Sequence, residues 1–239
     1  MRIDPSAQAA TAGRAPVTVA FCPCPPLLLP AVAGRAAEDT ATLRAACATA
    51  LGAMLDGRPE LIVVVGAGAE ERFGPGDGGD LRGFGVDLEI SFAGAVRPGG
   101  RRTPLAHTVG AWLLDEAGHR GPRLGVAPRD VAEVLAGPDG PVGLLVMGDG
   151  SARRSLKAPG YLDEAAAPFD AAVAAALAAG DAAALAGLDP GEGARLMAAG
   201  VPAWRAVGAA LAGREVTARL HFHEAPFGVG YLVADWWLP

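Results

Sequence analysis

ELIVVVGAG, at residues 60–68, is the stretch that decides the fold class of this chain. Five aliphatic side chains follow one another from Leu61 to Val65, without the alternating polar residues of a strand that has one face in water. Such a run is typical of a strand in a parallel sheet that helices cover on both faces. The glycines Gly66 and Gly68 then indicate a tight turn at the end of the strand.

Further apolar segments on either side of this run predict the other strands. They are PVTVAFC at 16–22, VDLEISF at 86–92, RLGVAP at 123–128, VGLLVM at 142–147, EVTARLHFHE at 215–224 and FGVGYLVADWW at 227–237. The Gly-rich stretch at 71–85 is expected to be a loop.

Helical segments alternate with these strands. We expect helices at 38–55, from Thr103-Pro104 to Gly118, at 128–136, and over the Ala-rich residues 168–212, which Gly180, Asp189-Pro190 and Gly200 interrupt. This alternation predicts a single α/β domain over residues 16–239, with a mostly parallel or mixed central sheet flanked by helices. Residues 1–15 are expected to form a disordered tail.

The composition narrows the class of protein. The chain has 239 residues and a formal net charge of −6, which argues against general nucleic-acid binding, since that needs a basic face. No apolar run reaches the roughly 20 residues of a membrane helix, and the first fifteen residues lack the apolar middle of a signal peptide. We therefore expect a cytoplasmic protein without a membrane partner. Three cysteines, an odd number, fit that compartment.

The expected strand ends carry the candidate motifs, because ligands of such sheets gather beyond the carboxyl ends of the strands. The turn after residue 65 has two glycines, but it lacks the third glycine of a dinucleotide-binding fingerprint and the helix that should follow directly. It is therefore interpreted as a tight turn. In MGDGSARRS, at 147–155, Asp149 is either an acid or base or a cap of the next segment. Arg153 and Arg154 either clamp an anionic ligand or form a solvated surface pair.

Two histidines near the C-terminus suggest a metal site. HFHE is expected to place His221 and His223 on one face of a strand and Glu224 on the other. Two imidazoles at this spacing can share a metal ion, with Cys24 or Asp149 as a third ligand. The alternative is a pair of half-exposed histidines with no ligand.

The cysteines at the end of the first strand have different expected roles. Cys22 and Cys24 lie two residues apart in FCPCPP, and we interpret Cys22 as a core residue. Cys24, held among prolines, is the better candidate for chemistry. Cys47 is expected to be buried in a helix.

Taken together, these strand-end motifs resemble the class III extradiol ring-cleavage dioxygenase superfamily, of the catalytic B-subunit type, and its Memo-like relatives. Members often carry Pro-His-Pro-Pro after the first strand, where this chain has Pro-Cys-Pro-Pro at 23–26. A later Gly-Asp-x-Ser-His resembles GDGSA at 148–152. Pro-Gly-Tyr and Phe-Asp pairs match 159–161 and 169–170, and the closing motif matches PFGVGY at 226–231. The resemblance spans nearly the whole chain.

The resemblance implies a ferrous ion held by two histidines and one carboxylate, with a further histidine as acid and base. This chain departs from the family pattern at those positions. Cys24 replaces the first histidine, Gly66-Ala67 stands near the second, and Ala152 replaces the acid/base histidine. Glu224 is left as the candidate carboxylate, and Memo-like relatives are thought to use a cysteine in their metal site.

We therefore expect a divergent member without the family iron and without another cofactor, which binds a small-molecule ligand or a partner protein through the ancestral pocket. The expected pocket residues are Cys24, Gly66, Ala67, Gly68, Asp149, Ser151, Arg153 and Glu224. The alternative is a metal-dependent oxidoreductase of the dioxygenase type, or a hydrolase. It would hold Fe(II) or Zn through Cys24, His221, His223 and Glu224, with Asp149 as the catalytic base. The apolar C-terminal VADWWLP suggests contact with the domain body or with a second copy, as in a homodimer.

Overall fold

The structure is a computed structural model that describes residues 15–239. Apart from Ala15, the tail expected at residues 1–15 lies outside the described residues. No helix in the described range is both long enough and apolar enough to cross a lipid bilayer.

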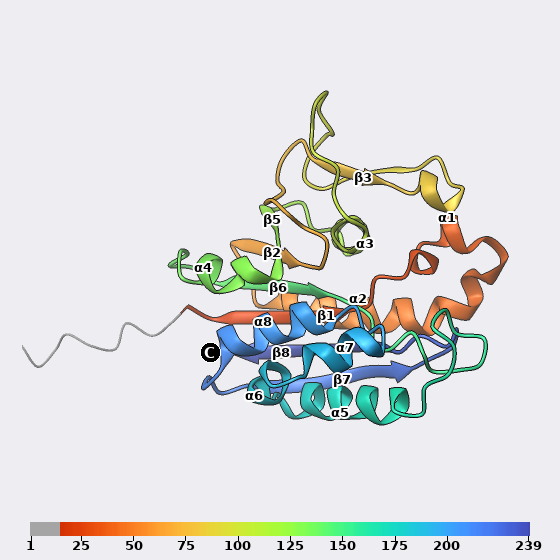
Figure 1. The fold of residues 1–239 in the computed structure, drawn as a ribbon. Coiled ribbons are helices and arrows are strands. Elements are labelled where there is room, and N and C mark those ends of the chain that lie inside the picture. Colours follow the sequence, from red (N-terminus) through yellow and green to blue (C-terminus); the bar gives the residue numbers. More distant parts are fainter. Residues whose placement is uncertain (1–14) are drawn as a thin grey trace, which may run out of the picture.

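A six-stranded sheet in the order β5-β2-β6-β1-β8-β7 forms the centre of the molecule (Figure 1). Its strands are β1 (Val17–Cys22), β2 (Leu61–Val65), β5 (Arg123–Val126), β6 (Val142–Met147), β7 (Thr217–Glu224) and β8 (Tyr231–Leu238). The first four strands are mutually parallel, whereas β8 runs antiparallel to both β1 and β7. The mostly parallel α/β sheet expected from the sequence is confirmed.

The apolar run of β2 is buried on both faces of this sheet, as its sequence predicts. Val63 and Val65 pack with Trp204 on one face, in a core that also includes residues of β6 and α5. Ile62 and Val64 belong to the core of the opposite face. The side chains of residues 62–65 have no solvent exposure.

Helices cover both faces. The face that contains Val64 packs against α2 (Ala41–Asp56) and α3 (Leu105–Glu116). The opposite face packs against α4 (Val131–Leu135), α5 (Ala166–Ala179), α6 (Ala182–Ala186) and α8 (Val201–Leu211), with α7 (Pro190–Arg195) beside α8. The short helix α1 (Pro30–Ala33) and 3₁₀ turns at Pro26–Leu28, Gly34–Thr40, Arg82–Phe84 and Pro128–Asp130 complete the elements.

The expected helix boundaries need small corrections. The α-helix expected from residue 38 begins at Ala41, after a 3₁₀ turn. The helix expected from Thr103-Pro104 begins at Leu105, and the Thr103 hydroxyl bonds the Thr108 hydroxyl at 2.9 Å. The Ala-rich segment divides at the expected places, with Gly180 in the left-handed region (φ 68°) and Asp189 capping α7.

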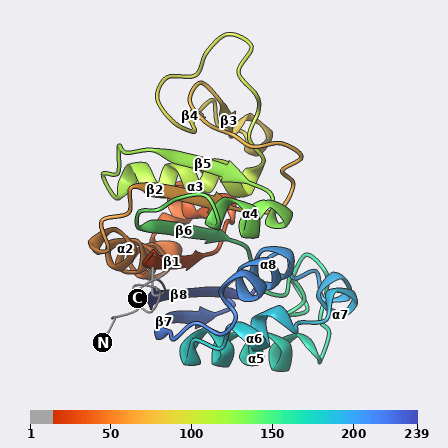
Figure 2. The same ribbon diagram turned by 90° about the vertical axis from the view of Figure 1, so that its left-hand side faces the viewer.

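The Gly-rich loop contains a strand that the sequence did not predict. β3 (Gly78–Asp80) pairs with β4 (Glu89–Ser91) in a separate two-stranded hairpin, which stands beyond β5 in Figure 2. The strand expected at 86–92 is therefore only three residues long and lies outside the central sheet. A Cβ on Gly79 would lie 2.0 Å from the Thr108 hydroxyl, so glycine is what lets β3 approach α3.

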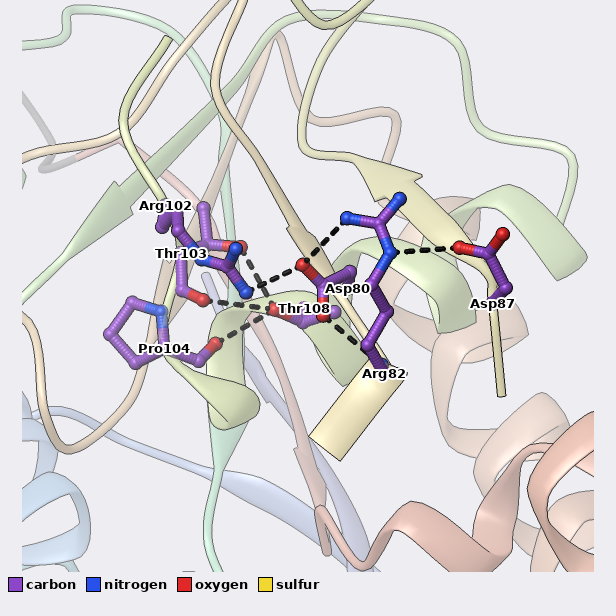
Figure 3. Close-up of polar contacts among 7 residues, drawn as sticks. All are labelled: Asp80, Arg82, Asp87, Arg102, Thr103, Pro104 and Thr108. Atoms are coloured by element: carbon purple, nitrogen blue, oxygen red, sulfur yellow. Dashed lines mark hydrogen bonds and ion pairs between the residues drawn. The ribbon is translucent and has the colours of Figure 1, made fainter. Parts of the chain in front are cut away.

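Charged side chains hold this hairpin against the start of α3 (Figure 3). The Asp80 carboxylate contacts Arg102 at 2.5 Å and accepts a hydrogen bond from the Arg82 backbone N–H at 3.0 Å. Arg82 also donates to Asp87 at 2.8 Å. The ion pairs in this cluster join Asp80 of β3 to Arg82 and to Arg102, so they help to fix the hairpin.

Candidate functional site

The carboxyl ends of β1 and β6 bring Cys24 and Asp149 together. Cys22 and Met147 are paired in the parallel register, and the Gly148 N–H donates to the Cys22 carbonyl at 3.0 Å. Two residues beyond this pair, the Cys24 backbone N–H donates to Asp149 Oδ1 at 2.7 Å. Asp149 therefore links two strand ends, instead of capping the segment that follows it.

Tyr231 completes this group of titratable side chains. It begins β8, and because β8 runs antiparallel to β1, its first residue lies at the same edge of the sheet as Cys24. The ring is buried, and the charges of Asp149 and Cys24 both act on its hydroxyl. We call Cys24, Asp149 and Tyr231 the edge cluster.

Burial controls the protonation of the edge cluster. It raises the pKa of the Asp149 carboxyl to about 6, against the opposing effect of the hydrogen bonds from Cys24. Burial, and then the negative charge of Asp149, raises the pKa of the Cys24 thiol. Burial also raises the pKa of Tyr231. Near neutral pH, the carboxyl can thus exchange its proton while the thiol and the phenol keep theirs.

A buried carboxylate supports the turn that carries Asp149. Asp170 has no solvent exposure; it accepts the Ser151 backbone N–H at 2.8 Å and pairs with Arg154 at 2.7 Å. A Cβ on Gly150 would lie 2.6 Å from the Asp170 carboxylate, and one on Gly230 would lie 2.0 Å from it. The turn is therefore packed so closely that only glycine fits at these two positions.

The other residues expected in this part of the pocket make contacts within the chain. The buried Ser151 hydroxyl donates to the Leu196 carbonyl at 2.7 Å. Arg153 donates to the Gly160 carbonyl at 2.7 Å and to the Arg195 carbonyl at 3.1 Å. Arg153 therefore joins the loop after β6 to α7, and Arg154 is engaged by Asp170.

The prediction that His221 and His223 share one face of a strand is wrong. A register shift between Leu220 and Phe222 makes His221 an extra residue in β7, and such a bulge interrupts the alternation of side chains. His221 Nε2 lies 2.9 Å from Asp235 Oδ2, on the side of the sheet that faces α2. His223 faces the opposite side, where burial and then the charge of Arg154 lower its pKa.

The four residues expected as alternative metal ligands do not converge. Cys24 packs with the core of the α2 side, whereas His223 faces the α5 side and His221 is paired with Asp235. Glu224 is exposed. Within residues 15–239, no group of three or more His, Cys, Asp or Glu side chains has a metal-binding arrangement. The residues present therefore do not fit the two-histidine, one-carboxylate site that the resemblance implies.

The turn after β2 has a mainly structural role. A Cβ on Gly66 would lie 2.7 Å from the Ala106 Cβ, so glycine allows α3 to approach the strand end. Gly68 has φ 84° and lines a small cavity of about 250 Å³. No helix follows the turn at once, in agreement with the interpretation as a tight turn. Ala67 lines a larger, open groove.

This groove, of about 700 Å³, lies between the turn after β2 and helices α7 and α8. Its walls include Ala67, Pro190, Ala194, Met197, Pro202 and Arg205. The junction of α7 and α8 is tied to the backbone of the turn after β6, because the Gly200 N–H donates to the Asp149 carbonyl at 2.8 Å. We call this cavity the α7–α8 groove.

The sequence did not single out the α7–α8 groove or Tyr231 as parts of the site. Residues 190–205 are rich in Ala, Gly and Pro, and their few charged residues form no recognisable ligand-binding motif. Tyr231 had a usable signal, since it lies in the last predicted strand, at 227–237, and ends the closing motif at 226–231. The chain matches no family model and no curated protein sequence.

Proposed function

We propose that this chain is a divergent, B-subunit-like member of the class III extradiol dioxygenase superfamily that binds a small organic ligand without the family's iron. The ligand site is the α7–α8 groove, at the carboxyl edge of the sheet beside Asp149. The observation that carries the proposal is this apolar groove of about 700 Å³, whose α7–α8 wall is joined to the Asp149 backbone through Gly200. Its volume lies in the usual range of small-molecule sites, roughly 300–1,000 Å³.

The edge cluster holds a proton-exchanging group behind the wall of the groove. Asp149 is half-buried and has a pKa of about 6. Its carboxyl can therefore accept or donate a proton close to neutral pH, and it bonds the Cys24 N–H rather than lining the groove.

The alternative is a metal-dependent oxidoreductase or hydrolase built on Cys24, His221, His223 and Glu224. It needs ligand atoms about 2.0–2.3 Å from one point. The bulge in β7 turns the two histidines to opposite faces of the sheet, and this separation favours the binding function.

A screen of small molecules by thermal shift tests the proposal. Ala194 is exposed on the wall of the groove, so Ala194→Trp fills the groove without disturbing the core. Ala175→Trp, on the exposed side of α5, is the matched control. We expect compounds that raise the Tm of the native protein and of Ala175→Trp, but leave Ala194→Trp unchanged. Compounds that stabilise Ala194→Trp equally would show that binding occurs elsewhere.

A further inference from the structure

Arg205 is the charged side chain on the wall of the α7–α8 groove. The residue is half-buried in α8, and its guanidinium donates to the Leu188 carbonyl. No carboxylate of the described chain lies within ion-pair distance of Arg205. A guanidinium has five N–H donors in a fixed fork, so one carbonyl leaves most of them available to a ligand.

The acidic residues near the groove are already engaged with other partners. The Asp189 carboxylate accepts the Glu192 backbone N–H at 2.6 Å and so caps α7. Glu192 lies 3.7 Å from Arg195, which also pairs with Asp163. The positive charge of Arg205 is therefore left for a ligand in the groove.

The remaining walls of the groove are aliphatic. Pro190, Ala194, Val201 and Pro202 line it, and no aromatic ring does. Met197 is 48% exposed and has φ 55°, in the left-handed region that is costly for a residue with a side chain. Its unbranched thioether adapts easily to the shape of an apolar ligand.

We infer that the α7–α8 groove takes an amphipathic anion: a medium-chain aliphatic carboxylate whose chain lies along the apolar wall. The carboxylate accepts hydrogen bonds from Arg205, because a guanidinium pairs with a carboxylate through two parallel N–H bonds. This inference rests on the proposed function and adds the ligand class to it.

The test measures binding of decanoate and of decanol to the full chain by isothermal titration calorimetry, below the concentrations at which either compound aggregates. The two ligands share an alkyl chain and differ in charge. We expect decanoate to bind at least about tenfold more tightly than decanol, as a charge-assisted hydrogen bond implies. Arg205→Gln should remove this preference, since the amide carries no charge.

Two further variants keep the result interpretable. Arg219→Gln removes an exposed arginine on β7, outside the groove, and should leave the preference unchanged. Arg205→Lys keeps the charge without the fork, and should retain part of the preference for decanoate.

Absence of decanoate binding, or an equal preference in native protein and Arg205→Gln, would overturn the ligand class. If compounds from the thermal-shift screen still stabilise the native protein but not Ala194→Trp, the proposed function stands while the ligand class fails. If no compound depends on the groove, both fail.

Discussion

Cys24 and Asp149 illustrate how two ordinary side chains become unusual at a strand end. The parallel register of β1 and β6 forces them together, and the hydrogen bond of 2.7 Å from the Cys24 N–H fixes the carboxylate. Burial then favours the protonated form of each group, so the pKa of both rises. The sequence identified both residues, but it left open whether Asp149 capped a turn or exchanged a proton.

The raised pKa of Asp149 predicts a pH dependence of stability. The pKa of Asp149 is about 6 in the folded state and the ordinary pKa of an aspartate is 3.8, so between these pH values the folded state holds a proton that the unfolded state releases. Stability is therefore greatest below about pH 4 for this group and is lost as the pH rises through 6, by about 3 kcal/mol.

Asp149→Asn removes this titration and keeps an oxygen to accept the Cys24 N–H. Urea unfolding at pH 4 and pH 7 should show a smaller loss of unfolding free energy in this variant than in the native protein. Asp39→Asn, at an exposed carboxyl, should behave as the native protein does. Equal pH dependence in all three proteins would show that Asp149 is not perturbed.

At the scale of elements, glycines decide how closely the strand ends and helices pack. Gly230, just before β8, donates to the Ser151 carbonyl at 2.8 Å and lies against the buried Asp170. Gly52, in the exposed face of α2, has open space around its Cα. The same substitution should therefore have opposite effects at these two positions.

Gly230→Ala places a Cβ 2.0 Å from Asp170 Oδ2, so it must displace a buried ion pair. We expect it to lower the unfolding free energy by about 2–4 kcal/mol. Gly52→Ala should raise it by about 0.5–1 kcal/mol, the difference in helix propensity. Chemical denaturation of both variants checks the pair, and a neutral effect at Gly230 would contradict the close packing of the turn.

The elements also show where sequence reasoning succeeds and fails. Continuous apolar runs such as 61–65 predicted the strands of the central sheet, because burial on both faces leaves a strong pattern. β3 was missed, since a three-residue strand rich in glycine shows no alternation, whereas β4 lies within the strand predicted at 86–92. The bulge in β7 was missed as well, because a register shift depends on the partner strand and not on the local sequence.

At the scale of the whole molecule, the sheet gathers the candidate site at one edge but does not gather the expected metal ligands there. Cys24, Asp149 and Tyr231 meet through strand order, which the sequence pattern could indicate. The shape of the α7–α8 groove depends on how α7 and α8 pack beside the contact between Gly148 and Gly200. A Cβ on Gly148 would lie 2.3 Å from the Gly200 Cα. Contacts of this kind arise from tertiary packing, so the groove was not predictable.

The measurement that tests the central claim most directly is the metal content of protein purified without oxygen, by inductively coupled plasma mass spectrometry, beside Cys24→Ala. If the site binds its ligand without the family's metal, iron and zinc should stay far below one ion per chain in both proteins. Near-stoichiometric iron or zinc in the native protein that disappears in Cys24→Ala would contradict the account and establish a remodelled metal centre.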